Sequence, residues 1–179
     1  MIRLTTFLFL ALLSAPLLSA DKSFFFTVDM NKLLRATDYG KNIIYVSGLE
    51  RKSLQIENQK LEAELLLEEK KLSELRKTLS SDEFRPKAVE FDKRVTVIRS
   101  EQSQKEQMMI SKARETEANF FKKVYPLLYE LLSDRGGVLL IDQRNVVLWD
   151  SSVDLTEDAV NLINQVFGKG TEVIEELIE

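Results

Sequence analysis

The stretch that decides the fold is residues 54–79, LQIENQKLEAELLLEEKKLSELRKTL. Leucine fills most of the two core positions of a seven-residue repeat, at Leu54, Leu61 and Leu75 in one position and at Leu65, Leu72 and Leu79 in the other. Asn58 and Glu68 interrupt this pattern. A heptad repeat of apolar residues is typical of a helix that packs along one stripe against another helix. The stretch therefore predicts a coiled-coil seam with two polar flaws.

The residues that follow predict a reversal of the chain near residues 80–86, SSDEFRP, which combine helix-capping side chains with a proline. A second heptad pattern then begins. Its core positions hold Phe84, Ala88, Phe91, Val95, Ile98, Gln102, Lys105 and Met109. We therefore expect an antiparallel helical hairpin arm over residues 47–116, with its tip near 80–86. An outgoing helix of roughly 37 residues would be about 55 Å long at 1.5 Å per residue.

The two ends of the chain carry the remaining aromatic and β-branched residues, and they predict three short strands. The first is the run 24–28, FFFTV. Residues 138–141 (VLLI) and 146–149 (VVLW), separated by the four-residue turn DQRN, read as a β-hairpin. Pro126 is expected to kink or restart a helix that ends at residues 136–137, and glycines 40 and 48 are expected to bend or weaken the first long helix. A final amphipathic helix is expected over residues 157–167.

Three short strands interrupted by a long helical excursion cannot close a sheet within one chain, and apolar edges would aggregate. The expected fold class is therefore α+β. It has a small intersubunit β-barrel body, built from residues 21–46 and 117–168 with three strands per chain, and the long hairpin arm. The side chains expected to form this oligomerisation body are Phe24, Phe26, Val28, Val138, Leu140, Val147 and Trp149.

Composition argues against catalysis. The chain has no cysteine and no histidine, which are the residues most used as nucleophile, near-neutral acid or base and transition-metal ligand. Asp142, Asp150 and Asp154 lie close in sequence, but turn and helix-cap roles explain them more simply than a hydrolytic site. The acidic balance, with no basic face interleaved with aromatics, argues against nucleic-acid binding. We expect a non-enzymatic protein without cofactor or metal.

The N-terminus predicts export. Arg3, the apolar run 4–13 and Ala20 have the order of a signal peptide over residues 1–20, cleaved near Ala20, although retention as a membrane anchor is an alternative. Removing Arg3 with that segment changes the net charge from −4 to −5. At the other end, residues 169–179 form an acidic tail to which we assign no role.

The order of these elements resembles the Skp (OmpH-like) periplasmic chaperones of outer-membrane proteins across nearly the whole exported chain, up to Gly168. The most specific part is residues 136–162: a glycine before a hydrophobic strand, an Asp-x-x-Asn turn, a second strand and the sequence Val-Asp-Leu-Thr before a helix. The resemblance implies a homotrimer whose strands form one barrel and whose three arms surround a cavity. It also implies an ATP-independent holding chaperone that sequesters unfolded outer-membrane β-barrel proteins. A structural coiled-coil tether or spacer of the envelope is the alternative.

Two sets of arm residues follow as candidates. Apolar side chains expected to face a client are Leu54, Leu61, Leu65, Phe91, Ile98, Met108, Met109 and Ile110. Basic side chains expected at the tip are Arg76, Lys77, Arg85, Lys87, Lys93 and Arg94. Residues 47–120 carry 15 basic and 15 acidic side chains, in contrast to the commonly basic arms of the family, while residues 76–99 carry seven against four. Weak contact of the tip with anionic lipid or lipopolysaccharide is a secondary hypothesis.

Overall fold

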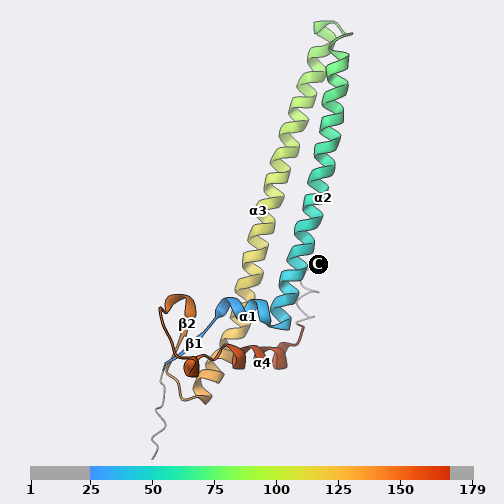
Figure 1. Cartoon of the computed structure of the whole chain (residues 1–179). Helices are drawn as coiled ribbons and strands as arrows, with labels where there is room; N and C mark the ends of the chain where they lie inside the picture. The colour runs from blue at the N-terminus through green and yellow to red at the C-terminus, as the bar shows by residue number, and fades with distance from the viewer. Residues whose placement is uncertain (1–24, 170–179) are drawn as a thin grey trace, which may run out of the picture.

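The protein is a long helical prong that rises from a small mixed body (Figure 1). The structure, a computed structural model, describes residues 25–169; the expected signal peptide, Phe24 and residues 170–179 lie outside the described residues. In chain order the elements are β1 (Phe25–Val28), α1 (Met30–Ala36), α2 (Asp38–Leu75), α3 (Ser81–Asp134), β2 (Leu139–Asp142), the 3-10 turns η1 (Gln143–Asn145) and η2 (Ser151–Val153), and α4 (Thr156–Phe167). The predicted helical hairpin is confirmed.

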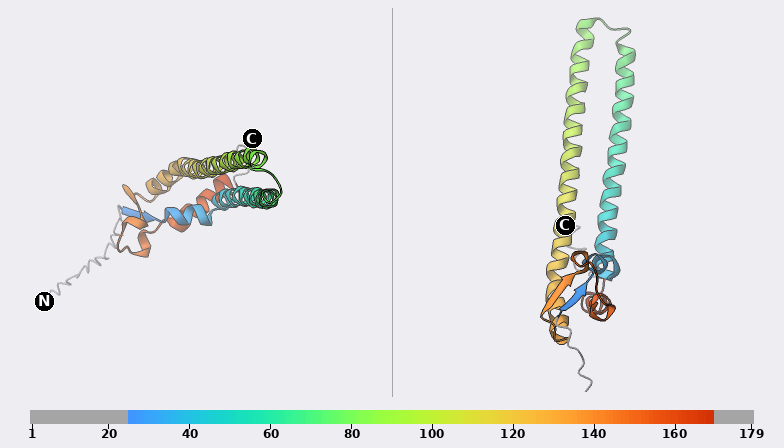
Figure 2. Two further views of the ribbon diagram at one scale, coloured as in Figure 1. Left: turned by 90° about the horizontal axis from the view of Figure 1, so that it is seen from above. Right: turned by 60° about the vertical axis from the view of Figure 1, so that its left-hand side comes forward.

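The arm consists of α2 and the first two thirds of α3, which run antiparallel and side by side in both views of Figure 2. At 1.5 Å per residue the 38 residues of α2 span about 57 Å. Half-buried positions recur along both helices at the predicted heptad spacing, while the positions between them are exposed. Of the predicted α2 leucines, only Leu75 is exposed, at 38%. Each arm helix therefore buries a single stripe against its neighbour.

The turn of the hairpin occupies residues 76–80, between the end of α2 and the start of α3. A capping box begins α3: the carboxylate of Glu83 accepts hydrogen bonds from the backbone N–H of Ser80, at 3.1 Å, and from its hydroxyl, at 2.7 Å. Pro86 and Pro126 both lie inside α3, which runs on to Asp134 without a break. The expected new helix start at Pro126 is therefore wrong. Both prolines are exposed, so the carbonyl groups that lose an N–H partner can bind water.

The body contains a two-stranded sheet rather than the expected hairpin. β1 and β2 pair in parallel, with Phe25 opposite Leu139 and Val28 opposite Asp142. The whole arm forms the connection between these two strands. One further bridge joins Thr27 to Asp154, beside a hydrogen bond from the N–H of Leu155 to the carbonyl of Thr27 at 2.9 Å.

The third strand, predicted at residues 146–149, is not formed within the single chain. Instead of a hairpin turn, β2 is followed by η1, in which the Asp142 carboxylate accepts a hydrogen bond from the N–H of Arg144 at 3.1 Å. The tight turn directs the chain away from the free edge of β2. As a result Val147 and Leu148 are 93% and 87% exposed.

The hydrophobic core lies at the base of the arm, where α1 and α4 pack against the ends of α2 and α3. Leu33, Tyr39, Phe120, Val124 and Ile163 are almost fully buried there. The ring centroid of Tyr39 lies 5.1 Å from that of Phe120 and 5.6 Å from that of Phe167, and in both pairs the ring planes are tilted relative to each other. These rings join the first turn of α2 to α3 and α4, so the core fixes the base from which the arm projects.

The turn between α1 and α2 is unusually tight. Thr37 caps α2 by accepting a hydrogen bond from the N–H of Gly40 at 3.1 Å, while its own hydroxyl donates to the carbonyl of Leu33 at 2.7 Å. A Cβ on Gly40 would lie 1.9 Å from the carbonyl oxygen of Leu34. Only glycine allows α1 and α2 to approach this closely. Gly48, by contrast, lies in the middle of α2 with open space around the position of a Cβ.

We predict opposite effects for alanine at these two glycines. Gly40→Ala should lower the free energy of unfolding by about 2 kcal/mol, because the backbone of Leu34 must move. Gly48→Ala should raise it by up to about 1 kcal/mol through helix propensity alone. Urea unfolding followed by circular dichroism measures both. Equal changes in the free energy of unfolding for the two substitutions would contradict a close approach of α1 and α2 at Gly40.

Candidate functional site

The seam of the arm contains most of the apolar residues that the sequence suggested for client contact. Six of the eight are half-buried between α2 and α3: Leu54, Leu61, Leu65, Phe91, Ile98 and Met109. Met108 and Ile110 are exposed, at 63% and 43%. The seam residues therefore hold the arm together, and only Met108 and Ile110 offer their side chains freely to another molecule.

A second set of apolar residues, which sequence reasoning missed, lies on the outer faces of the arm. They are large, exposed and not part of the heptad core: Tyr45, Leu49, Ile56, Leu66 and Leu67 on α2, and Val89 and Val97 on α3. The heptad register could have predicted their exposure, because apolar residues outside the core positions of a two-helix hairpin have no helix to pack against. We call these seven residues together with Met108 and Ile110 the outer apolar set.

The seam is interrupted by polar groups at the predicted places. The Oδ1 atom of Asn58 is buried and has no hydrogen-bond partner in the described residues. Glu68 forms an ion pair with the guanidinium of Arg94, with a nitrogen–oxygen distance of 2.6 Å. Closer to the body, Lys112 forms an ion pair with Glu50 at 2.9 Å. These ion pairs are largely exposed and each contributes little to stability. The arm is therefore held mainly by its leucines and is weakest where Asn58 replaces one.

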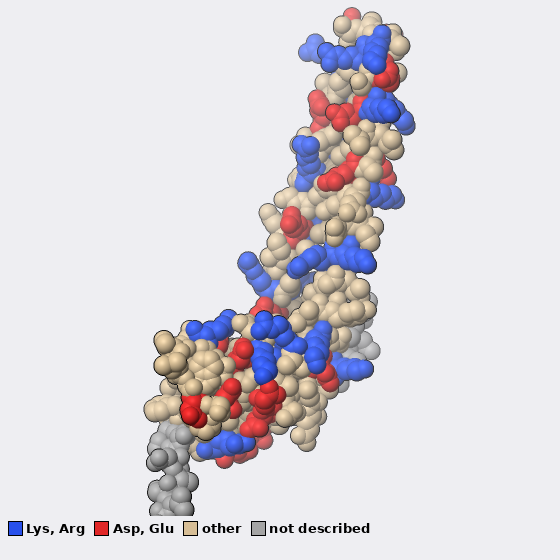
Figure 3. Space-filling view, viewed as in Figure 1, with Lys and Arg blue, Asp and Glu red and all other residues tan. Residues whose placement is uncertain are grey.

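On the face of the arm seen in Figure 3, side chains of both charge signs alternate along its length. Two of the six predicted tip cations have carboxylate partners: Lys77 pairs with Glu74 at 2.9 Å and Arg94 with Glu68. Arg94 and its neighbour Lys93 also lie more than ten residues into α3, roughly 20 Å from the turn.

The remaining cations lie nearer the turn. The guanidinium of Arg76 lies 5.9 Å from the ring centroid of Phe84, where a cation–π attraction is favourable. Arg85 and Lys87, in the first two turns of α3, form no ion pair within residues 25–169. Hydrogen bonds from the hydroxyl and backbone of Ser80 hold the pKa of Glu83 below its usual value, so this carboxylate stays charged and offsets part of the positive charge. Lipid contact by the tip stays a prediction.

An open groove follows α2 just below the turn, with a volume of about 680 Å³. It is lined by Leu67, Lys70, Lys71, Glu74, Leu75, Lys77 and Thr78. Exposed leucines flanked by the long aliphatic stems of lysines form an adaptable apolar surface with charged margins. Such a surface can contact many different apolar segments but selects none by shape.

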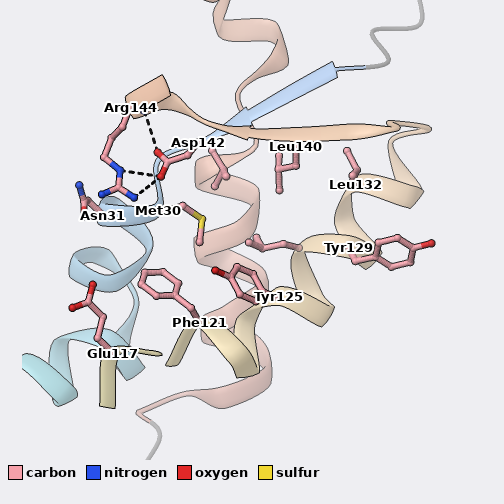
Figure 4. A pocket seen from close by; sticks show the side chains of 12 residues that line it. Met30, Asn31, Glu117, Phe121, Tyr125, Tyr129, Leu132, Leu140, Asp142 and Arg144 are labelled. Atoms are coloured by element: carbon pink, nitrogen blue, oxygen red, sulfur yellow. Dashed lines mark hydrogen bonds and ion pairs between the residues drawn. The ribbon is translucent and has the colours of Figure 1, made fainter. Parts of the chain in front are cut away.

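A second hollow, of about 470 Å³, lies in the body beneath β2 (Figure 4). Phe121, Tyr125 and Tyr129 enter it from successive turns of α3, opposite Met30 and Leu140. Its margin carries Glu117, Asn31 and the ion pair of Asp142 with Arg144. The hydrogen bonds and charge of Arg144 hold the pKa of Asp142 below its usual value. The hollow is aromatic and open, without a converging nucleophile and base.

The three aspartates considered for hydrolysis are used as local caps. Asp142 binds Arg144, Asp150 accepts a hydrogen bond from the N–H of Ser152 at 2.8 Å, and Asp154 accepts one from the N–H of Thr156 at 2.9 Å. Burial alone would raise the pKa of Asp154, but the hydrogen bonds of Thr156 and Gln143 and the charge of Lys32 together hold the pKa below its usual value. The carboxylates do not converge on a cleft. Within residues 25–169, no cluster of acidic side chains is suited to hold a metal ion.

The residues predicted for assembly divide into two groups. Phe26 and Val28 are buried inside the single chain and Leu140 is half-buried, so they stabilise the body itself. Val138, Val147 and Trp149 are exposed. Val147 and Trp149 belong to the segment 146–149, whose backbone forms no strand in the described chain, and Val138 directly precedes β2. The exposed group is thus available for contact with another chain.

Comparison with known proteins agrees with this architecture. The profile of the outer membrane protein (OmpH-like) family matches residues 25–163. The chain belongs to the OmpH-like family. The crystal structure, at 2.83 Å, of a candidate outer membrane chaperone (OmpH-like) from Caulobacter crescentus superposes with a TM-score of 0.73, covering 80% of this chain and 85% of the other at 12% identity. That similarity shows a shared fold. The comparison with curated proteins found no significant match.

Membership of the OmpH-like family supports a chaperone role in general. OmpH-like proteins are periplasmic, which agrees with the predicted export. Among the helices of residues 25–169, none combines the length and the apolar character needed to cross a membrane.

We predict that Asn58→Leu stabilises the arm. The substitution removes a buried carbonyl oxygen without a partner and continues the leucine seam, so the free energy of unfolding should rise by about 1 kcal/mol. The matched control is Gln59→Leu, an exposed neighbour, which should change it by less than about 0.5 kcal/mol. Thermal unfolding of the two variants compares them. A destabilised Asn58→Leu would mean that this amide has a partner.

Proposed function

We propose that this OmpH-like protein is an ATP-independent holding chaperone of the periplasm that sequesters unfolded outer-membrane β-barrel proteins between helical arms. The observation that carries the proposal is the outer apolar set: large apolar side chains lie exposed along a prong of about 57 Å, interleaved with charges. Soluble proteins rarely expose so much apolar surface along one element unless it contacts another molecule.

The chemistry of the arm suits a client without fixed shape. Each exposed leucine or methionine can bury apolar area worth about 25 cal/mol per Å², so many weak contacts add up without any one of them being decisive. Met108 is unbranched and polarizable, which suits adaptable contacts. An unfolded outer-membrane strand exposes alternating apolar side chains and an unpaired backbone edge. When such a strand is bound to an arm whose surface combines charged and exposed apolar side chains, edge-to-edge aggregation is prevented, and no nucleotide is required.

We further propose that three copies assemble through the body, so that three arms enclose the client. The support is the exposed segment 146–149, which is rich in β-branched and aromatic residues yet unpaired in a single chain. Paired with the sheet of another copy, it becomes the third strand of a closed intersubunit barrel, which removes the exposed strand edges. The number three comes from the resemblance to the Skp family.

The chaperone proposal predicts that suppression of client aggregation depends on the outer apolar set and not on the seam residues. We expect the exported chain to suppress light scattering when a urea-denatured outer-membrane β-barrel protein is diluted into buffer, at about one trimer per client. The variant Ile56→Gln, Leu67→Gln, Met108→Gln should lose several-fold in suppression, because it removes exposed apolar area without touching the seam.

The matched control changes exposed polar positions, Gln59→Ala and Gln104→Ala, and should protect as the parent does. Circular dichroism and the solution mass confirm that each variant keeps its fold and assembly. A well-assembled parent that leaves client aggregation unchanged would overturn the proposal and favour an envelope tether.

The assembly proposal predicts that Val147→Asp yields a folded monomer. The side chain is 93% exposed in the single chain, so the substitution should change the stability of the body by less than about 0.5 kcal/mol. In a barrel the new charge would be buried between copies and would block association. Size-exclusion light scattering measures the mass, with Val97→Asp on the outer face of α3 as control. A trimer that persists in Val147→Asp would place the interface elsewhere.

A further inference from the structure

The outer face of α2 carries an apolar stripe close to the body. Tyr45, Leu49 and Ile56 are 63%, 50% and 56% exposed, and spacings of four and seven residues put them on one face of the helix. This face points away from the seam, whose nearest residues are Leu54 and Asn58. We call the three residues the base stripe. Nothing within residues 25–169 covers it.

The described chain ends beside this stripe. α4 packs against the start of α2 (Figure 1), where the N–H of Asp38 donates to Oδ1 of Asn164 at 2.7 Å. Beyond α4, the side-chain amide of Asn42 donates to the carbonyl of Lys169 at 2.8 Å. Asn42 is three residues before Tyr45 and seven before Leu49, so it belongs to the same face of α2. The chain that follows Lys169 therefore starts at the lower end of the base stripe.

Residues 171–179, TEVIEELIE, have the chemistry to cover the base stripe. Val173, Ile174, Leu177 and Ile178 would share one face of a short helix, with four glutamates around them. Such a short segment does not form a stable helix alone and needs a surface to pack on. Beside the base stripe, Lys52 and Lys60 form no ion pair within residues 25–169. The apolar side chains of the tail, flanked by glutamates, would thus contact the apolar base stripe, which is flanked by lysines.

We infer that residues 171–178 dock in cis on the base stripe, beside the lysines at 52 and 60. The distance allows it with Gly170 as the only linker. From Asn42 to Leu49 the helix rises about 10 Å, and eight tail residues span about 12 Å as a helix or roughly 26 Å when extended. A helical tail covers Tyr45 and Leu49 and brings its glutamates to Lys52. An extended tail reaches Ile56.

The proposed contact would cover apolar surface of the base stripe within a single chain. The intramolecular contact itself does not depend on the proposed chaperone function, and its test uses no client.

The absence of cysteine from the chain provides a direct test. The double variant Leu49→Cys, Leu177→Cys in the otherwise complete exported chain places one thiol on the base stripe and one in the tail. Under mild oxidation we expect an intrachain disulfide that forms at least about tenfold faster than in the control Val97→Cys, Leu177→Cys, because docking raises the local thiol concentration. Val97 is exposed to a similar degree on α3, and its distance from Lys169 along the arm is far greater.

Two further measurements complete the test. Lys52→Glu together with Lys60→Glu should slow the intrachain disulfide several-fold, and raised salt should do the same in the parent pair. Mixing with an excess of the cysteine-free chain separates contact within a chain from contact between copies, since only an interchain product is diluted. Equal rates in the two cysteine pairs, an interchain product alone, or no effect of charge reversal would each overturn docking in cis as proposed.

Discussion

Each arm helix has only one neighbour, and most properties of the molecule follow from that constraint. A helix that packs along one stripe can bury about two residues in seven, so every other apolar side chain on it must meet solvent or another molecule. α2 and α3 meet this condition with leucine, phenylalanine and isoleucine in the seam and charged residues on most outer positions. The outer apolar set breaks the pattern. Exposure of these side chains costs free energy unless a surface outside the seam covers them, and this cost is the physical basis of the proposed contacts.

The packing at the base of the arm fixes the orientation of the arm relative to the body. The tilted rings of Tyr39, Phe120 and Phe167 join α2, α3 and α4 within one buried cluster. Thr37 links the end of α1 to the start of α2 through its hydroxyl, which donates to the carbonyl of Leu33 and accepts from the N–H of Gly40. Above the base, α2 and α3 are joined by the seam and by exposed ion pairs such as Arg94 with Glu68 and Lys112 with Glu50. The seam also contains the buried Oδ1 atom of Asn58, which has no hydrogen-bond partner in the described residues.

Sequence periodicity predicted the arm well because the rule behind it is local. The heptad register of residues 54–79 placed the seam on the residues that are half-buried, and capping chemistry placed the reversal within a few residues of the observed turn. The same register places Leu54, Leu61 and Leu65 in the seam, where they are half-buried, and leaves Ile56 and Leu67 outside it, where they are exposed. The helix restart, one of the two expectations for Pro126, does not occur, because an exposed carbonyl can exchange a backbone hydrogen bond for water at small cost.

The body was harder to predict because strand pairing is not local. The segments 138–141 and 146–149 have the composition of a hairpin, yet β2 pairs with β1 from the other end of the sequence, and the Asp142 cap turns the chain into η1. A two-stranded parallel sheet, with one further bridge from Thr27 of β1 to Asp154 and an unpaired outer edge on β2, is too small to be stable on its own. Its inner face rests on the helical core through Val28 and the half-buried Leu140, which explains how the single chain tolerates it. The open edge of β2 and the exposed apolar segment 146–149 therefore occur together in one small region. The proposed addition of that segment to the sheet of another copy would cover both.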